Sequence, residues 1–236
     1  MTSRERVMTA IDRRFPDRTP ADYKAEPEVN QYMMKRLKVN SYEELLRRLE
    51  SDMRRLEPRY IGSEFKKYED GVVEDYWGIR SKHLRASHGS YNMYVHTPVW
   101  DAESVEDLKK HKWPRPDIFD YSVMREQCAR AREGGYAIMY EGADLFTRPC
   151  TLRNMENVML DMVERPEMAH FLFDQFTRFY CEDATRALEA QNGNVVAARQ
   201  QKALQKKKLL EQALFNLRRL RGSYAPPPRP ALDSCS

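Results

Sequence analysis

Three carboxylates stand where acid–base or electrostatic chemistry could take place. Glu141 and Asp144 follow residues 136–140, a stretch rich in aromatic and apolar side chains that predicts a short buried strand. Asp22 lies at the end of residues 19–23, which predict the first strand of the fold. A carboxylate at such a position can orient a substrate N–H group or stabilise positive charge that develops during a reaction. We therefore predict catalytic roles for Asp22, Glu141 and Asp144.

Tyr23, Lys24 and Tyr140 flank these acids and are predicted to bind a small-molecule substrate. Each of these predictions has a structural alternative. The two acids of the 141–144 loop could instead cap the helix that follows it, and Asp22 and Tyr23 could cap the next loop. Tyr140 could be a core residue. The sequence alone leaves these alternatives open.

The elements around the acids form a strand–loop–helix pattern. After the loop, apolar residues recur at helical spacing from about residue 151, among them Met155, Met159 and Met162, which are predicted to lie in the core. Strand, acid-bearing loop and helix form the βα unit of α/β barrels and doubly wound sheets. In those folds the chemistry takes place on loops at the C-terminal ends of the strands. The pattern predicts an active-site wall over residues 140–146.

Capping boxes at residues 2–5 and 41–44 predict two helix starts, because a hydroxyl and a carboxylate satisfy free amides there. The second helix is expected to cover residues 45–56, with Arg54 and Arg55 on its solvated face. Further helices are predicted over residues 102–108, 121–132 and 166–192.

Residues 59–100 carry strand and turn patterns and predict hairpins inserted after an early strand. Trp77 is expected to pack in the core and Arg80 to pair with an acid. Three histidines of this insertion could meet a ligand or face solvent: His83, His88 and His96.

The charge of the chain is divided unevenly. Residues 194–236 hold nine Lys and Arg and two acids, a net charge of +7, whereas residues 1–193 carry a net charge of −3. Leu210, Leu214 and Leu217 predict a basic amphipathic helix, which a Pro-rich, partly disordered tail follows. We therefore predict one domain over residues 1–193 and a solvated tail that is not expected to bind nucleic acid.

Composition also limits the location and the chemistry of the protein. The sequence has no apolar run of about 18 residues and no signal-peptide pattern, so a cytoplasmic protein without membrane contact is expected. The four cysteines form no CxxC pair, and the five histidines form no HxxxH or HxC motif. We therefore expect reduced thiols, no metal site and no cofactor.

The order of several short segments resembles the uroporphyrinogen decarboxylase family, whose superfamily also contains corrinoid-linked methyltransferases. The resemblance covers roughly residues 3–193. The matching segments, in chain order, are residues 4–11, 16–20, 74–80, 103–108, 113–114, 136–146, 155–162 and 165–166. It implies an α/β fold of the (β/α)8 TIM-barrel type. It also implies cofactor-free decarboxylation of porphyrinogen acetate side chains, with a tetrapyrrole as the small-molecule substrate.

Three departures from the family pattern shape the expectation. The arginine-bearing segment that follows the first strand in the family reads here as residues 21–28, with Lys24 as its cation, and one Lys does not replace a bidentate Arg. No tyrosine follows Glu141 before Phe179, where the family has one. The basic tail does not resemble the family's continuation.

The departures predict an incomplete barrel, the N-terminal half of a family member with a β-rich insertion and an unrelated basic helical tail. Two alternatives to the decarboxylase stay open. One is a corrinoid-linked methyltransferase, and the other is an inactive truncated fragment. An open half-barrel leaves strand edges and an apolar face uncovered, so self-association is expected.

Overall fold

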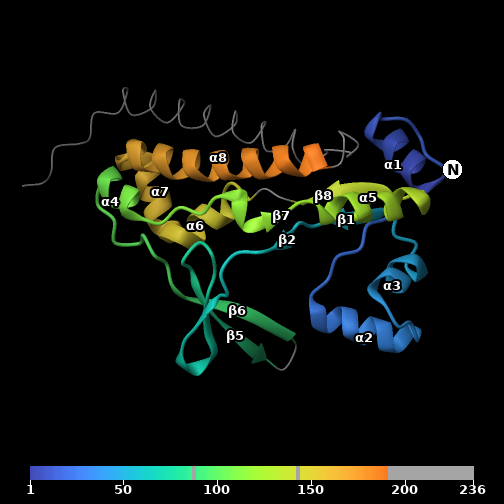
Figure 1. The fold of residues 1–236 in the computed structure, drawn as a ribbon, viewed down its shortest axis with the longest axis horizontal. Helices are drawn as coiled ribbons and strands as arrows, with labels where there is room; N and C mark the ends of the chain where they lie inside the picture. The colour runs from blue at the N-terminus through green and yellow to red at the C-terminus, as the bar shows by residue number, and fades with distance from the viewer. Residues whose placement is uncertain (87–88, 142–143, 191–236) are drawn as a thin grey trace, which may run out of the picture.

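The computed structural model describes residues 1–86, 89–141 and 144–190 of the 236-residue chain. These residues form a mixed α/β structure of helices and small sheets (Figure 1). The α-helices are α1 (Ser3–Ile11), α2 (Pro27–Leu37), α3 (Tyr42–Arg48), α4 (Val105–Lys110), α5 (Val123–Glu133), α6 (Thr147–Arg153), α7 (Met155–Glu164) and α8 (Pro166–Ala190). The strands are β1 (Met53–Leu56), β2 (Arg59–Tyr60), β3 (Lys66–Lys67), β4 (Val72–Glu74), β5 (Arg80–Ala86), β6 (Gly89–His96), β7 (Phe119–Asp120) and β8 (Ala137–Tyr140). Among the described residues these strands do not close into a barrel.

The parallel unit consists of β1, β8 and the helices α1 and α5 that pack on them. β1 and β8 pair in parallel, with Met53 opposite Ala137 and Leu56 opposite Tyr140. The backbone amide of Arg4 on α1 donates a hydrogen bond to the carbonyl of Gly135 at 2.8 Å, directly before β8. The apolar cluster beneath α5 consists of Leu56, Tyr121, Met124, Cys128, Ala131, Ile138 and Ala187. The strand predicted over residues 136–140 is thereby confirmed.

β1 occupies residues that were predicted to be helical. α3 ends at Arg48, and Glu50 adopts a left-handed backbone conformation with a φ of 53°. Met53–Leu56 then alternates half-buried and buried side chains beside β8. Pairing with a buried strand overrides the helical spacing of the apolar residues, as tertiary contacts commonly override local propensity. The helix predicted over residues 45–56 is therefore wrong beyond residue 48.

The predicted first strand is also wrong, since residues 19–23 lie in no sheet. The segment is held beside β1 by Asp52, whose backbone amide donates to the Ala21 carbonyl at 2.8 Å and whose Oδ2 accepts from the Ala21 amide at 2.8 Å. The buried Asp52 carboxylate also binds Arg6 at 2.6 Å and Arg18 at 2.8 Å. A network of ion pairs, and not a strand ladder, therefore positions this segment.

The hairpin sheet consists of β3, β4, β5 and β6 in antiparallel order, as the turn patterns of residues 59–100 predict. Figure 1 shows it as a separate projection from the layer of helices. Asp70 and Gly71, both with positive φ, form the turn before β4. Arg80 pairs with Glu74 at 2.8 Å, so the expected ion pair is confirmed.

The aromatic core lies between the start of the hairpin sheet and the first half of α8. Trp77 is 1% exposed, and its ring stacks on that of Phe176 with 4.4 Å between centroids. Phe179 lies 4.8 Å from Trp77 and 6.3 Å from Tyr76, ring to ring. α8 spans both regions, because its later residues Asp183 and Ala187 are buried in the parallel unit. The burial predicted for Trp77 is confirmed.

The helical pattern after β8 forms two helices, α6 and α7, which separate at Asn154 with a φ of 74°. The prediction that the methionines of this region lie in the core is wrong for Met155 and Met159, which are 53% and 43% exposed. Leu160 and Val163 are exposed on α7 as well. Val158 is fully buried, so α7 packs through one face and leaves apolar side chains on the other.

No helix within the described ranges is long and apolar enough to cross a membrane. Residues 194–236, for which a basic amphipathic helix and a tail are predicted, lie outside the described residues, as does His88.

Candidate functional site

The site is built at the C-terminal ends of β1 and β8. Arg55 on β1 binds two acids that are distant in sequence. Its Nη1 donates to Asp22 Oδ1 at 3.0 Å, its Nη2 binds the other oxygen of the same carboxylate, and its Nε donates to Glu141 Oε2 at 3.2 Å. The structure thus brings Asp22 and Glu141, two of the predicted catalytic residues, onto one guanidinium.

Two of the residues predicted to bind substrate belong to the same cluster. Lys24 Nζ lies 2.7 Å from Glu141 Oε2, and the Tyr23 carbonyl accepts a hydrogen bond from Arg55 Nη1 at 3.1 Å. We call Asp22, Tyr23, Lys24, Arg55 and Glu141 the strand-end cluster. It holds two cationic and two anionic side chains, so its charges balance.

The strand-end cluster is sheltered on one side and open on the other. The side chains of Arg55 and Glu141 are 15% and 11% exposed, whereas those of Asp22 and Lys24 are 32% and 65% exposed. Burial lowers the pKa of Arg55, but its hydrogen bonds with Asp22 and the negative charges of Asp22 and Glu141 outweigh burial and raise it. Arg55 therefore stays cationic at every physiological pH.

Asp144 does not join the strand-end cluster. Its Oδ1 accepts hydrogen bonds from the backbone amides of Thr147 at 2.8 Å and Phe146 at 3.3 Å, at the start of α6. Free amides at a helix start favour such a carboxylate. The structure therefore places Asp144 in the capping position that was the alternative to catalysis.

Tyr140, the last residue of β8, points its hydroxyl at Asp183 of α8, and the Tyr121 hydroxyl donates to the other oxygen of that carboxylate at 2.5 Å. Burial raises the pKa of Asp183, which is 4% exposed, and the two tyrosine hydrogen bonds oppose that shift. Burial and the Asp183 carboxylate raise the pKa of Tyr140. Tyr140 is therefore a neutral donor that ties β8 to α8.

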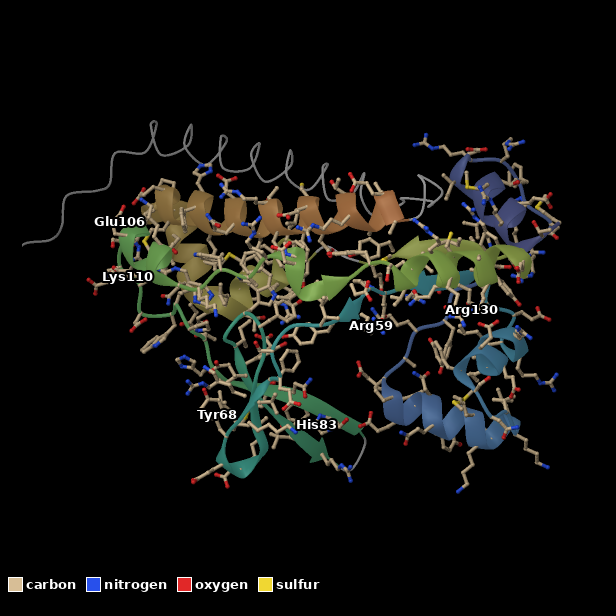
Figure 2. The ribbon with its side chains drawn as sticks, viewed as in Figure 1. Arg59, Tyr68, His83, Glu106, Lys110 and Arg130 are labelled. Carbon is tan, nitrogen blue, oxygen red and sulfur yellow. The ribbon has the colours of Figure 1, made fainter. Side chains whose placement is uncertain are left out.

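A cleft of about 370 Å³ lies beside β1, between α3 and α5, and Arg55 lines it. Three more arginines line the cleft: Arg47, Arg54 and Arg130. Figure 2 shows Arg130 on the side of α5 that faces α3. The carboxylate that lines this arginine cleft is Glu43, which binds Arg47 at 2.9 Å and Arg54 at 2.7 Å. Four arginines and one carboxylate therefore line the arginine cleft, and Arg55 and Arg130 also pair with acids outside it.

Arg54 lines this cleft but is itself mostly buried, with an exposed fraction of 7%. Its guanidinium lies 3.5 Å from the centre of the Tyr136 ring, and its Nη1 donates to the carbonyls of Ser51 at 2.9 Å and Met53 at 2.8 Å. A guanidinium over an aromatic face is stabilised by the negative charge of that face. These contacts fix Arg54, whereas Arg47 and Arg130 are 64% and 68% exposed and pair with Glu43 and Glu126 on their own helices.

Sequence reasoning missed the arginines of this site. Arg54 and Arg55 were assigned to the solvated face of a helix, and only their place on β1 directs them to opposite sides of a parallel pair. The segment Met53–Leu56 contains two central charges and no apolar run, so no periodicity distinguishes it as a strand. Asp183 was missed because it falls within a helix whose apolar spacing is otherwise regular.

Among the described residues, no group of three or more His, Cys, Asp or Glu side chains could hold a metal ion. A scan against protein-family models, a search of curated proteins and a search of solved structures each found no match to this chain.

Proposed function

We propose that this chain is a uroporphyrinogen decarboxylase-like carboxy-lyase that acts on a carboxylated tetrapyrrole or a related small molecule. The observation that carries the proposal is the convergence of Asp22 and Glu141 on Arg55 at the ends of two parallel strands. The βα arrangement around β8 also supports an incomplete (β/α)8 barrel as the parent fold. Loops at strand ends are where such folds perform chemistry.

The arginine cleft supplies what residues 21–28 lack for this chemistry. Arg47, Arg54 and Arg130 line this cleft beside Arg55, and Glu43 is the one carboxylate among its lining residues. An arginine presents a planar fork that matches a carboxylate, and several such forks suit a substrate with several acid groups. We therefore propose that the arginine cleft binds the carboxylates that do not react.

The strand-end cluster would act on the reacting side chain by an exchange of partners. A substrate carboxylate that binds Arg55 displaces Asp22, the more exposed of its two acids. The released Asp22 carboxylate can then stabilise a protonated pyrrole. The C–C bond to the carboxylate breaks, its electron pair enters the protonated ring and CO2 leaves. The side-chain carbon then binds a proton from solvent, and the ring releases the proton that it gained, which restores the neutral pyrrole.

Anaerobic incubation of the full chain with uroporphyrinogen tests the proposal. We expect coproporphyrinogen to form, and we expect Asp22→Asn to lower kcat by about 100-fold, the usual effect of removing one electrostatic stabiliser. The control is Glu133→Gln at the end of α5, which alters an exposed carboxylate that does not line the cleft. A folded, monodisperse protein that forms no product would overturn the proposal.

A further inference from the structure

A second cleft, of about 680 Å³, lies where the hairpin sheet meets the segment between α4 and β7. Aromatic rings form much of its wall. Tyr60 stacks on Tyr76 with 5.9 Å between ring centroids, and Phe65 lies 5.0 Å from Tyr60. Trp113 also lines the cleft, and its indole is fixed because Nε1 donates to the Leu108 carbonyl at 3.0 Å. We call this the aromatic cleft.

His111 lines the aromatic cleft and carries a buried ring nitrogen, Nε2, that has no hydrogen-bond partner. Its ring packs edge-on against Trp113 at 4.9 Å between centroids. Burial lowers the pKa of His111, and a hydrogen bond with the Trp77 backbone opposes this shift. A neutral imidazole that donates through Nδ1 to that backbone has Nε2 as an acceptor. His111 therefore contributes a buried, unpartnered acceptor to the wall of the cleft.

Some of the charged side chains around the aromatic cleft have ion-pair partners, and others do not. Lys66 and Arg80 both bind Glu74, at 3.2 and 2.8 Å. Lys112 lines the cleft, is exposed and has no ion-pair partner among the described residues, and Arg115 beside it lies 3.5 Å from an exposed carboxylate. Positive charge is thus available at the edge formed by Lys112 and Arg115.

We propose that the aromatic cleft binds a planar aromatic acid that carries a ring N–H or O–H group. The ring would pack against the aromatic wall of the cleft beside Trp113, the donor would bind His111 Nε2, and the anionic group would pair with Lys112. Aromatic walls with a few placed polar groups are typical of small-molecule sites. The site lies apart from the strand-end cluster, so it stands independently of the proposed decarboxylase activity.

Isothermal titration calorimetry of the full chain with three matched probes tests this site. The probes are indole-3-acetate, indole-3-acetamide, which lacks the charge, and 1-methylindole-3-acetate, which lacks the donor. We expect saturable binding of indole-3-acetate and at least fivefold weaker binding of each of the other two. Equal affinities for the three probes, or no saturable binding at millimolar concentration, would overturn the proposal.

Substitutions at Lys112 and His111 test which residues make the proposed contacts with the probe. Lys112→Gln should weaken indole-3-acetate binding at least fivefold and leave indole-3-acetamide unchanged, whereas Lys109→Gln, an exposed lysine on α4 outside the cleft, should change neither. His111→Phe should remove the preference for indole-3-acetate over its methylated analogue. If His111→Phe does not fold, the methylated probe on the unaltered chain decides the same contact. An unchanged affinity in Lys112→Gln contradicts the assignment.

Discussion

The parallel unit and the aromatic core are stabilised by different forces. In the parallel unit, the buried carboxylate of Asp52 binds two arginines, and Arg55 holds two further acids beside a cluster of mostly small and medium-sized apolar residues. In the aromatic core, Trp77, Phe176 and Phe179 pack ring against ring. Ion pairs stabilise the parallel unit, and apolar contacts stabilise the aromatic core. Acid, salt and substitutions should therefore change the stability of the two regions differently.

The largest effect should come from the aromatic core. Phe176→Ala removes a fully buried ring that stacks on Trp77, and we expect the free energy of unfolding to fall by about 4 kcal/mol through lost burial and the cavity left behind. Phe15→Ala is the control, because Phe15 is entirely exposed and should leave stability nearly unchanged. Urea unfolding measures both, and similar losses in the two variants would break the assignment of Phe176 to the core.

The parallel unit should be most sensitive to the loss of a charge. Arg55→Met leaves Glu141 and Asp22 without their shared cation, and breaking a sheltered pair in this way should cost about 3 kcal/mol. Arg59→Met is the matched control, since Arg59 pairs with Asp120 at the surface and such a pair contributes at most about 1 kcal/mol. Equal losses in chemical denaturation would show that the strand-end cluster is not sheltered.

The pH dependence of stability should differ in sign between two buried acids, Asp183 and Asp52. Burial raises the pKa of Asp183 above its ordinary value. Its contribution to stability is therefore full below the ordinary pKa and is lost as the pH rises through the raised one. Asp183→Asn stays neutral at every pH, so wild-type stability should decline relative to this variant as the pH rises above the ordinary carboxyl pKa.

Asp52 should show the opposite trend. Burial works to raise its pKa, but hydrogen bonds from the Ala21 amide, Arg6 and Arg18 outweigh burial and lower it. Asp52 therefore contributes fully to stability above the ordinary pKa of an aspartate. This contribution is lost as the pH falls through the lowered pKa that Asp52 has in the folded state. Asp52→Asn should flatten the acid limb of the stability curve in thermal melts between pH 7 and 2. Parallel curves for Asp52→Asn and Asp183→Asn would contradict this contrast.

The same difference explains what the sequence could predict. β8 and α8 carry runs or spacings of apolar residues, and both were predicted close to their observed bounds. β1 reads Met-Arg-Arg-Leu and owes its conformation to β8, a partner about 80 residues away along the chain, so no local pattern identifies it. Elements held by apolar periodicity can be read from a sequence more readily than elements held by charge.

The strand-end cluster was predictable in part for a related reason. The rule that parallel strands present loops at a common end predicts that Asp22 and Glu141 approach each other. That approach occurs although residues 19–23 form no strand, because Asp52 holds the segment in place. The role of Arg55 could not be predicted, since it depends on the register of β1 against β8.

The smallest expected effects come from the two capping boxes, one in each region. Thr2 caps α1 in the parallel unit through Glu5, and Ser104 caps α4 beside the aromatic core through Asp107. Because a cap acts on its own helix start, Thr2→Ala and Ser104→Ala should each cost about 1 kcal/mol when the chain unfolds as one cooperative unit. If the regions unfold separately, hydrogen exchange would show lost protection in α1 for the first variant and in α4 for the second. Loss of protection across both regions in either variant would show that α8 couples them, since it contributes Phe176 to one and Asp183 to the other.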